Sequence, residues 1–495
     1  MGLLAGAALV SLSVRAGQPF DFAAAQRLAA ERAGRPWSET FPELPKKLRQ
    51  LDYDQLRDIR FDPQSALWRM ERLPFQVQFF HPGGLHADRI TLRWFEGEAM
   101  ETMFFRKDLF DYGKVDIGRS IPDDVGFSGF RLHYPLNRPD YLDELIVFQG
   151  ASYFRALGMG QRYGLSARGV AVNVSTAEPE EFPRFVEFWL EKPDRTARQM
   201  RWFALLDGPS LTGAYEFLVT PGRTTTLDVR AALYLRRPVT MLGIAPLTSM
   251  FWFGENSLGC RNDYRPEVHD SDGLLLHTGA GEWLWRPLEN EPRLRYATFV
   301  DNNPRGFGLF QRDHRFASYE DLEAEYHLRP SVWVEPLTPW GEGEVRLVEI
   351  PTDTEYNDNI VACWVPRALP AAGEPMEFSY RLHWLTDAPG WPPLGRTVAT
   401  RVAAIPYLPR ARKFVLDFGG SAALEAAAAD SLLLDVAVSN GKILGRVLHE
   451  NDYYRTWRAV FDVQPEDAAR PVELRCFLKN AERPLTETWT YLWLP

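Results

Sequence analysis

Alternation of apolar and polar residues dominates the chain after residue 70. An apolar side chain at every second position is typical of a strand that buries one face of a sheet. This pattern predicts strands at residues 75–80, 90–95, 170–174, 185–190 and 201–206. Helix is expected near the start, where Asp21 can cap a helix over residues 22–33 that ends at Gly34. A second, short helix is expected after Ser318, with Asp321 as its capping partner.

A proline-rich stretch divides the chain into two predicted units. Residues 389–412 combine several prolines with a basic run, which is typical of a linker. After it, residues 413–495 contain strand-like runs at 413–417, 432–438, 442–448, 456–463, 472–478 and 488–493, with a hairpin turn expected at 439–441. Short strands at such intervals suggest an immunoglobulin-like sandwich. Residues 17–388 are too many for a seven-strand sandwich, so we expect an all-β fold in which a large, elaborated antiparallel β-sandwich precedes the smaller one.

The N-terminus is similar to the core of an export signal. Residues 1–14 are uncharged and apolar, and this stretch is too short to span a bilayer. Val14-Arg15-Ala16 would serve as a cleavage site after Ala16. We therefore interpret residues 1–16 as a truncated signal segment whose start codon lies upstream, with the twin-arginine route as one option. The alternative is an ordinary apolar N-terminus.

Composition narrows the class of function. With 45% hydrophobic and 25% charged residues, the 495-residue chain is typical of a soluble globular protein rather than a disordered or membrane-spanning one. Its formal net charge of -10 argues against DNA or RNA as a partner and suits a neutral or cationic ligand. The chain also contains 16 Trp, 18 Tyr and 31 Phe, an aromatic surplus that the fold and the ligand must explain.

Local motifs for nucleotide or metal chemistry are missing from the sequence. It contains no Walker loop, no dinucleotide-binding glycine motif, no zinc-hydrolase motif and no nucleophile elbow. Cys260, Cys363 and Cys476 are far apart and odd in number, so neither a disulfide framework nor a zinc site is indicated. We therefore expect no metal and no organic cofactor.

Acidic residues are concentrated in the region from about residue 255 to 360. Asp270 and Asp272 stand two residues apart beside His269, and in an extended chain both carboxylates would share one face. A turn that Asp side chains cap and a calcium loop are the alternatives for this motif. Asp358 belongs to an acidic loop between two further predicted strands. These strands are expected at residues 345–350 and 360–365.

Aromatic residues accompany these acidic clusters in the sequence. The tryptophans concerned are Trp283, Trp285, Trp333, Trp340 and Trp364. Sugars pack their C–H faces on rings and need carboxylate, amide and guanidinium partners, so this mixture is typical of a glycan site. The turn at residues 301–304 and Arg305 add such groups, although a purely structural Asx-turn is the alternative there. Glycosidic cleavage requires two carboxylic acids, and Asp270 and Asp358 form one plausible pair.

Several motifs are similar to those of a known family. They occur in order at residues 150–156, 163–169, 243–251, 269–272, 301–304, 330–336 and 358–361. From about Phe20 to Trp489 the chain resembles the periplasmic glucan biosynthesis proteins G and D, the MdoG, OpgG and OpgD family, with the D branch closer. The resemblance implies a large β-sandwich followed by an immunoglobulin-like domain, a periplasmic location and a homodimer. For the D branch it implies an anomer-inverting endo-β-1,2-glucanase of glycoside hydrolase family 186 that acts on osmoregulated periplasmic glucans.

The resemblance also implies roles for individual residues. The two essential aspartates of the family fall on Asp270 and Asp358, with Asp358 as general acid and Asp270 as general base, and the reverse assignment stays open. In this family the base reaches the attacking water through a relay of waters, so the usual carboxylate separation need not apply. The substrate-binding candidates are Tyr153, Arg155, Asp272, Trp283, Asp301, Asn302, Trp333 and Tyr356.

One segment departs from the D-type pattern. Residues 403–410 stand where D-type hydrolases have a longer loop that helps to cover the cleft. A shorter cover can favour a sugar hydroxyl over water as the acceptor. An inverting β-1,2-glucan transglycosylase that cyclises or branches its substrate is therefore the first alternative, and a non-catalytic glucan-binding assembly factor is the second.

Overall fold

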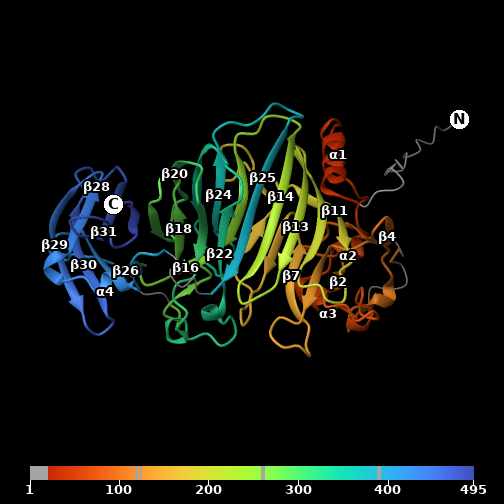
Figure 1. The fold of residues 1–495 in the computed structure, drawn as a ribbon, viewed down its shortest axis with the longest axis horizontal. Coiled ribbons are helices and arrows are strands. Elements are labelled where there is room, and N and C mark those ends of the chain that lie inside the picture. The colour runs from red at the N-terminus through yellow and green to blue at the C-terminus, as the bar shows by residue number, and fades with distance from the viewer. Residues whose placement is uncertain (1–19, 117–120, 123–124, 258–261, 387–391) are drawn as a thin grey trace.

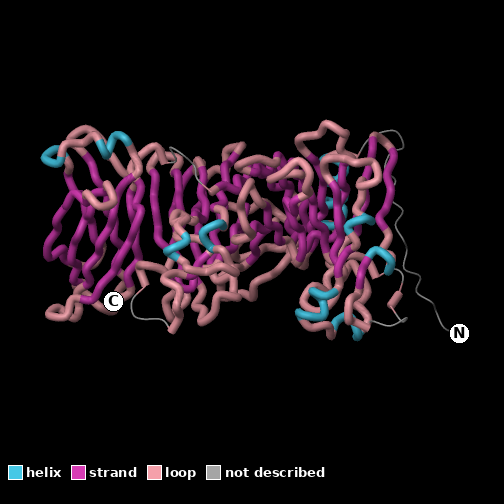
Figure 2. Tube along the Cα trace, turned by 90° about the horizontal axis from the view of Figure 1, so that it is seen from below, coloured by secondary structure: helices cyan, strands magenta, loops and turns pink. Residues whose placement is uncertain are grey.

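β-Strands are the main regular structure of the chain, and short helices lie at its periphery (Figures 1 and 2). A computed structural model of the chain describes residues 20–116, 121–122, 125–257, 262–386 and 392–495. The predicted signal segment and Cys260 lie outside these ranges. The N-terminal part and the C-terminal strands lie at opposite ends of the long axis (Figure 1). The predicted all-β class is confirmed.

Sheet I is the first of two large sheets. Among the described residues it has ten strands, and all its strand pairs are antiparallel. In spatial order they are β2 (Gln76–Phe80), β6 (Gly129–Tyr134), β7 (Asp143–Gln149), β8 (Tyr153–Ala156), β9 (Ser166–Arg168), β15 (Leu242–Ser249), β24 (Ile360–Pro366), β23 (Glu342–Glu349) and β20 (Arg295–Asn302), with β10 (Val170–Val172) paired to β15. The strands predicted at 75–80, 170–174, 345–350 and 360–365 are confirmed in this sheet.

Sheet II is the longer sheet, with fourteen strands in the described part of the chain. In spatial order they are β28 (Leu433–Val438), β31 (Val472–Lys479), β32 (Thr488–Trp493), β19 (Trp283–Pro287), β18 (Gly273–His277), β21 (Gly306–Phe310), β22 (Ser331–Pro336), β25 (Pro375–Leu385), β14 (Thr225–Leu235), β13 (Leu211–Thr220), β12 (Met200–Asp207), β11 (Arg184–Glu191), β3 (Thr91–Glu96) and β4 (Ala99–Met103). The pairs β3–β11 and β19–β32 are parallel. The predicted strands at 90–95, 185–190 and 201–206 lie here.

The remaining elements are short or belong to the C-terminal unit. Sheet III consists of β26 (Arg396–Ala404), β27 (Arg412–Gly419), β30 (Thr456–Gln464) and β29 (Lys442–Asn451). Two small ribbons pair β1 (Arg60–Phe61) with β5 (Phe110–Asp111), and β16 (Phe251–Phe253) with β17 (Val268–His269). The described helices are α1 (Phe22–Ala33), α2 (Lys46–Arg49), α3 (Tyr53–Asp58) and α4 (Ala422–Glu425), and the 3-10 turns are η1 (Pro63–Ser65), η2 (Lys107–Leu109), η3 (Phe316–Ser318), η4 (Tyr326–Leu328) and η5 (Ala429–Ser431).

Buried aromatic rings join sheets I and II into a sandwich. Phe148 on β7 lies 5.7 Å from Trp202 on β12, centroid to centroid, in an edge-to-face contact. Phe154 on β8 lies 6.3 Å from Trp384 on β25. Burying one such side chain stabilises the fold by roughly 1.5–3 kcal/mol. The core between the sheets therefore accounts for a large share of the aromatic surplus.

Helix α1 covers the outer face of sheet II, as its sequence predicts. The Asp21 carboxylate accepts a hydrogen bond of 2.8 Å from the Ala24 amide, and Gly34 ends the helix. Phe20, just before the helix, stacks on Trp189 of β11 with centroids 4.4 Å apart. The predicted helix over residues 22–33 is confirmed, because its cap and its apolar face are both encoded locally.

Sheet III and the end of sheet II form the C-terminal sandwich. Phe414 on β27 lies 5.9 Å from Trp489 and 5.4 Å from Tyr491, both on β32. In the described chain this unit has four strands from sheet III and three from sheet II, as expected for an immunoglobulin-like sandwich. Strand β32 also pairs in parallel with β19, with Trp285 opposite Trp489. Sheet II therefore continues without a break from the large unit into the small one.

The segment 389–412, interpreted as a linker, contains strand β26. This strand pairs with β27, and its Thr397, Ala399 and Thr400 are buried. The prolines that suggested a linker flank the strand in the sequence rather than interrupt it. Residues Arg396–Ala404 therefore belong to the C-terminal sandwich.

The predicted hairpin turn at residues 439–441 is wrong. Strand β28 before it belongs to sheet II and β29 after it belongs to sheet III, so the segment crosses from one sheet to the other. The Asn440 amide fixes this crossing by donating hydrogen bonds to the carbonyls of Asp467 (2.8 Å) and Arg470 (3.1 Å). An Asn-Gly pair marks a turn, but it does not specify which strands the turn connects.

The short helix expected after Ser318 is also absent from the described residues. Only the one-turn elements η3 and η4 occur there. Asp321 does cap backbone amides, since its carboxylate accepts hydrogen bonds from Glu323 (2.9 Å) and Ala324 (2.8 Å). The capping residue was recognised correctly, but the chain that follows turns toward the site described below instead of continuing as a helix.

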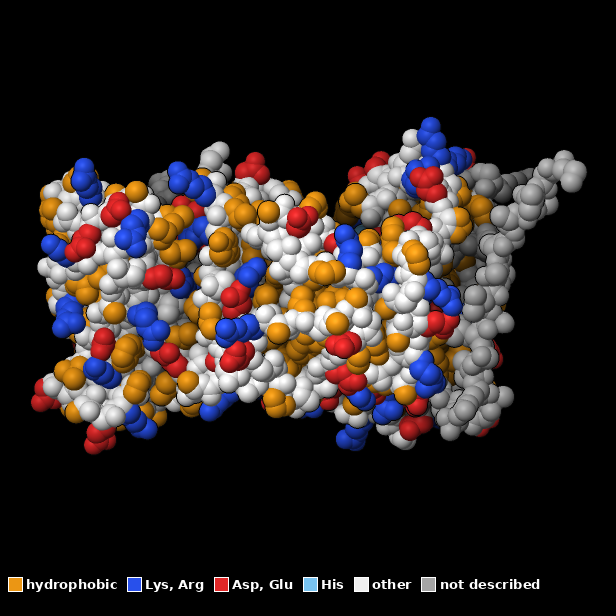
Figure 3. Space-filling model, turned by 90° about the horizontal axis from the view of Figure 1, so that it is seen from above, with side chains coloured by type: hydrophobic (Ala, Val, Ile, Leu, Met, Phe, Trp, Pro, Cys, Tyr) orange, Lys and Arg blue, Asp and Glu red, His pale blue; other side chains and the backbone are white. Residues whose placement is uncertain are grey.

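The surface carries charges of both signs. On the face drawn in Figure 3, acidic and basic side chains are interspersed, so this face presents no broad field of one sign. Such a surface suits a neutral ligand better than a polyanion. Of the helices described, none is both long and apolar enough to cross a membrane.

Candidate active site

Asp358 lies on the loop that joins β23 to β24. Glu349 pairs with Ile360 at the base of this hairpin, and the loop spans residues 350–359. The buried side chain of Asn359 fixes the loop: its oxygen accepts from the Phe251 amide (2.8 Å) and its nitrogen donates to the carbonyls of Phe251 and Ile350 (both 3.0 Å). Three hydrogen bonds therefore hold Asn359, and because Asn359 follows Asp358 directly, they also restrict the position of Asp358.

A network of charged side chains ties the acidic loop to the body. Arg265 donates a hydrogen bond of 2.8 Å to Glu355 of the loop, and it also pairs with Asp263 and Asp321. The Tyr326 hydroxyl donates to the same Glu355 carboxylate. These bonds offset part of the negative charge that the loop would otherwise carry into the site.

Asp270 faces the same region from the segment between β17 and β18. Its side chain is buried, and its carboxylate forms an ion pair with Arg329. The Arg329 guanidinium lies 4.1 Å over the Tyr326 ring and donates to the Ala324 carbonyl at 3.1 and 3.2 Å. Asp270 therefore meets a rigidly held positive charge.

Asp358 and Asp270 influence each other electrostatically. The Asp358 side chain is 34% exposed and lies 3.5 Å from the Arg155 guanidinium. Partial burial raises the pKa of Asp358, the charge of Arg155 opposes this rise, and the negative charge of Asp270 adds to it. The charge of Arg329 also lowers the pKa of Asp358. The two carboxylates and two arginines thus form one electrostatic unit.

Strand β8 supplies two of the predicted substrate-binding residues to this unit. Tyr153 and Arg155 are two residues apart and share a face of the strand. Arg155 also donates a hydrogen bond of 2.6 Å to the Ser166 hydroxyl, which orients its guanidinium. Burial raises the pKa of Tyr153, and the charge of Asp358 contributes to the rise. Tyr356 lies two residues before Asp358 on the acidic loop, and its side chain is 88% exposed.

Trp283 and Trp333 lie in the core instead of on a cleft wall. They are only 5% and 1% exposed. Trp283 stacks on His277 at 4.0 Å and on Trp333 at 5.7 Å. Because the two rings cover each other and are buried, neither presents a face on which a sugar could stack. The alternating pattern did not reveal this, since it does not identify which sheet face meets another layer.

Asp301 and Asn302 lie far from Asp358 along sheet I. The residue that pairs with Glu349, at the base of the acidic loop, is Arg295, six positions before Asp301 on β20. Six residues of strand span about 20 Å. Asp301 accepts hydrogen bonds from the amides of Gly279 (2.9 Å) and Asn302 (2.8 Å), so its carboxylate is engaged with backbone groups. These bonds are not the Asx-turn considered above, because the Asn303 amide donates to the Gly341 carbonyl instead. The structure therefore does not bring these residues to the aspartate pair.

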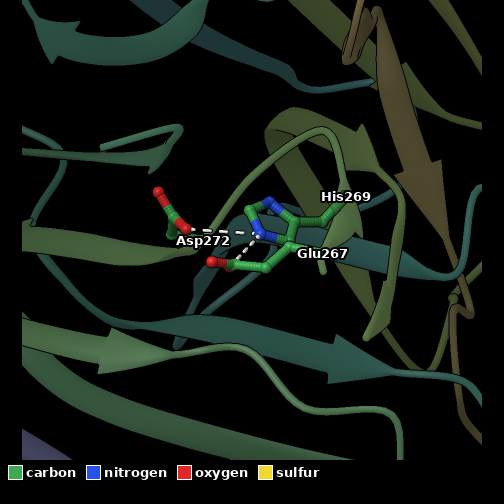
Figure 4. Close-up of side chains that lie close together, drawn as sticks. All are labelled: Glu267, His269 and Asp272. Atoms are coloured by element: carbon green, nitrogen blue, oxygen red, sulfur yellow. Dashed lines mark hydrogen bonds and ion pairs between the residues drawn. The ribbon is translucent and has the colours of Figure 1, made fainter. Parts of the chain in front are cut away.

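Asp272 faces away from Asp270. The chain bends at Asp270 and again at Asp272 instead of running extended, so the two carboxylates do not share a face. Asp272 accepts from the amides of Arg312 and Asp313 (3.1 Å) and lies 3.5 Å from His269. It belongs to the cluster of Glu267, His269 and Asp272 drawn in Figure 4.

The charged groups in that cluster shift one another's pKa values. Burial lowers the pKa of His269, but Asp272 and Glu267 more than compensate and raise it to about 9. The nearby Glu255 has its pKa raised to about 8 by burial and by the charges of Glu267 and Asp272. Burial likewise raises the pKa of Asp272.

Several residues of the site were not recognised in the sequence. Arg329, Tyr326 and Glu355 complete the surroundings of the two aspartates, although Arg329 is 59 residues from Asp270. No local spacing could have indicated this pairing. Arg265 carries a clearer signal, because it is a basic residue between Asp263 and Glu267 in a region rich in carboxylates.

A polar cavity of about 670 Å³ adjoins the acidic loop. It lies between the loop and the C-terminal sandwich. Its walls include Thr352 and Asn357 from the loop, Asn290 from the large unit, and Val402, Arg412 and Trp493 from the C-terminal unit. The space next to the loop is therefore shared by both units.

Comparison with known proteins identifies the family. The sequence profile described as "Periplasmic glucan biosynthesis protein, MdoG" matches residues 20–493. A glucans biosynthesis protein G from Ralstonia nicotianae is 43% identical over 501 residues, covering 99% of each chain. Proteins of the same name from Rhodopseudomonas palustris (strain BisA53) and Vibrio cholerae (strain O395) are each 44% identical, covering 96% of this chain and 93% and 87% of their own. These relatives carry the G name, so they lend no support to the D branch. The chain belongs to the MdoG family of periplasmic glucan biosynthesis proteins.

Proposed function

We propose that this protein acts in the periplasm on the β-1,2-glucan backbone of osmoregulated periplasmic glucans, as an anomer-inverting endo-β-1,2-glucanase. The family and the names of its relatives support a role in glucan biosynthesis. The observation that carries the catalytic proposal is the pairing of two carboxylates with two arginines, Asp270 with Arg329 and Asp358 with Arg155. The net charge of -10 is compatible with an uncharged polymer.

Asp358 is proposed as the general acid. An acid must hold its proton at working pH and must reach the glycosidic oxygen. Burial and the charge of Asp270 raise the pKa of Asp358, which favours the protonated form. With 34% of its side chain exposed, Asp358 is also accessible to a polymer.

Asp270 is proposed as the general base. Its ionised form is stabilised by contact with the Arg329 guanidinium, which the Ala324 carbonyl and the Tyr326 ring hold in place. Because Asp270 is buried, a relay of water molecules would carry the proton from the attacking water to its carboxylate. Two carboxylates in such different surroundings suit the division of labour that inversion requires.

Tyr153, Arg155 and Tyr356 are proposed to bind the sugar. Arg155 can donate to sugar hydroxyls beside Asp358, since 43% of its side chain is exposed. The exposed ring of Tyr356 offers a face on which a glucose unit could stack. Asp272, Asp301, Asn302, Trp283 and Trp333 are not part of this proposal, because each is engaged elsewhere.

Product analysis tests the proposal. The purified protein is incubated with linear β-1,2-glucan, and the products are separated by chromatography and mass spectrometry. Short linear oligosaccharides with new reducing ends are expected. Glu342→Gln, which removes an exposed carboxylate at the opposite end of β23 from the acidic loop, is the control and should cleave like the wild type. An unchanged polymer with measurable binding would replace the proposal with that of a glucan-binding assembly factor.

A transglycosylase is the second candidate, and one observation favours it. The hairpin loop between β26 and β27 spans residues 405–411. Val402, near the end of β26, and Arg412, at the start of β27, line the cavity that Thr352 and Asn357 of the acidic loop also line. The shortened segment therefore adjoins the loop of Asp358, where a sugar acceptor could replace water. Cyclic or branched products without new reducing ends would establish transfer instead of hydrolysis.

Export and assembly complete the proposal. The apolar N-terminal residues and the family name support export to the periplasm, with the twin-arginine route as the proposed path. Fractionation of cells with and without a functional twin-arginine system tests the route. A homodimer is proposed from the resemblance alone, and light scattering after size exclusion measures it directly.

A further inference from the structure

A second cluster of ligand-forming side chains lies behind Asp270. His269 Nε2 is 3.0 Å from Glu267 Oε2 and 3.5 Å from Asp272 Oδ1, and the three donor atoms lie within 4.8 Å of one another. Figure 4 shows the two carboxylates converging on the same ring nitrogen. His269 is 0% exposed, so bulk water does not surround this group.

Hydrogen bonding assigns the tautomer of His269. The Gln311 amide nitrogen donates to the carbonyls of His269 (3.0 Å) and Tyr326 (3.3 Å), which fixes its oxygen toward His269 Nδ1 at 2.9 Å. That oxygen can only accept, so Nδ1 carries a proton. The other ring nitrogen, Nε2, faces the two carboxylates. It carries either a second proton or a lone pair that can bind a metal ion. A histidine whose far nitrogen donates to an amide or carbonyl oxygen is the usual arrangement of a metal ligand.

The charge around the cluster is predominantly negative. Glu255, Glu267 and Asp272 all line one small cavity of about 30 Å³. Arg312, on the same wall, is engaged by both oxygens of Glu487 and stacks 3.5 Å over Trp285. A protonated His269 balances only one of the carboxylates of Glu267 and Asp272, which leaves a buried negative charge in the cluster. Such a charge is costly, and a dication in place of the Nε2 proton would supply the missing positive charge. The cavity is large enough for one water-sized ligand.

We propose that Glu267, His269 and Asp272 form a binding site for one divalent transition-metal ion of the Zn²⁺ or Mn²⁺ kind. Metal–ligand distances of about 2.0–2.2 Å place neighbouring donor atoms roughly 3.0–3.5 Å apart, which matches the two separations above. An imidazole ligand disfavours Ca²⁺ and Mg²⁺, which prefer oxygen alone. The cavity beside Glu255 supplies room for a water as the next ligand.

The proposed ion would position Asp270 without touching substrate. His269 and Asp272 flank Asp270 in the sequence, and their side chains point to the other side of the segment. An ion that holds residues 269 and 272 restricts the backbone between them, and with it the position of the Asp270 carboxylate. This consequence rests on the proposed glucanase function, whereas the binding of the metal does not.

Metal binding is measured on the full chain. Protein stripped with a chelator is titrated with Zn²⁺ and with Mn²⁺ by calorimetry, and its melting temperature is recorded with and without each ion. One ion per chain and a higher melting temperature are expected. Glu267→Gln and Asp272→Asn should each weaken binding by at least about tenfold. Asp313→Asn, which alters another carboxylate lining the same cavity, is the control and should bind like the wild type.

Two results would overturn the site. One is wild-type protein that binds neither ion and does not change its melting temperature. The other is equal binding by wild type and Glu267→Gln, which would assign the ion to a different place. Should Glu267→Gln fail to fold, Co²⁺ titration of the wild type followed by visible absorption replaces it. A spectrum of a site with one nitrogen and several oxygen ligands supports the proposal, and the spectrum of hydrated Co²⁺ alone contradicts it.

Discussion

Asp270 and Asp272 are two residues apart in the sequence, yet they serve opposite sides of one segment. Asp270 pairs with Arg329 and influences Asp358 on the acidic loop. The Asp272 carboxylate lies beside His269 and accepts hydrogen bonds from the backbone amides of Arg312 and Asp313. Ser271 alone separates them, and the chain bends at both aspartates. Carboxylates that spacing groups together can therefore belong to different sites, and only their partners distinguish the chemistry each one can perform.

Replacing each aspartate tests this comparison, with the largest expected effect at Asp270. Asp270→Asn removes the proposed base and should lower kcat by at least about 10²-fold, as expected for the loss of general base catalysis. Asp272→Asn acts only through position and should retain more activity than Asp270→Asn. The measurement is turnover of linear β-1,2-glucan, with circular dichroism to confirm that each variant folds. A greater loss at Asp272 would reverse the assignment.

The Asp270–Arg329 pair should also be important for stability. Arg329→Met leaves a buried carboxylate without its partner, which costs about 3–5 kcal/mol of unfolding free energy. Adding Asp270→Asn to this variant removes the isolated charge and should recover part of the loss. Urea unfolding of the wild type, both single variants and the double variant measures the coupling. Purely additive losses would mean that the two side chains do not interact.

Buried and exposed rings provide the next contrast. Trp333→Ala should lower the unfolding free energy by about 3–5 kcal/mol because it opens a core cavity. Tyr356→Ala should change stability by less than about 0.5 kcal/mol, since the ring is on the surface. It should nevertheless raise KM several-fold through the loss of about 1 kcal/mol of stacking. Unfolding curves and glucan kinetics separate the two effects. An unchanged KM in Tyr356→Ala would remove this ring from the site.

The smallest predicted effect is a shift in pH dependence. If Asp358 must be protonated, kcat/KM falls as pH rises through its pKa. Burial and the charge of Asp270 raise that pKa, whereas the charges of Arg155 and Arg329 lower it. Removing the positive charge in Arg155→Met should therefore move the falling limb of the profile to higher pH. Arg367→Met, at an exposed ion pair on the far end of sheet I, is the control and should leave the limb unchanged. A shift to lower pH in Arg155→Met would contradict the acid role.

Local signals in the sequence predicted local structure well. Asp21 and Gly34 bracket α1 as expected, because a cap acts on amides three residues away. Alternation located strands such as β11 and β12. It did not reveal that residues 439–441 cross between sheets, nor that β26 occupies the expected linker, since both depend on which distant strands pair.

Only part of the candidate site could be predicted from the sequence. Tyr153, Arg155 and Asp358 could be named because the motifs at residues 150–156 and 358–361 resemble those of the family, and Asp358 also lies in a recognisable acidic loop. Arg329 could not, because its contact with Asp270 joins segments far apart in the chain. Trp283 and Trp333 were expected beside sugar, but burial between two layers of strands assigns them to the core.

Asp358 and Asp270 are proposed to cleave a glucan with inversion at the anomeric carbon. Following the first turnovers on linear β-1,2-glucan by proton NMR, before the new reducing ends equilibrate, tests it most directly. With inversion of a β-linkage, α-anomeric ends appear first in the wild type, and Asp358→Asn produces none at a comparable rate. β-Anomeric ends first, or wild-type rates in Asp358→Asn, would contradict it.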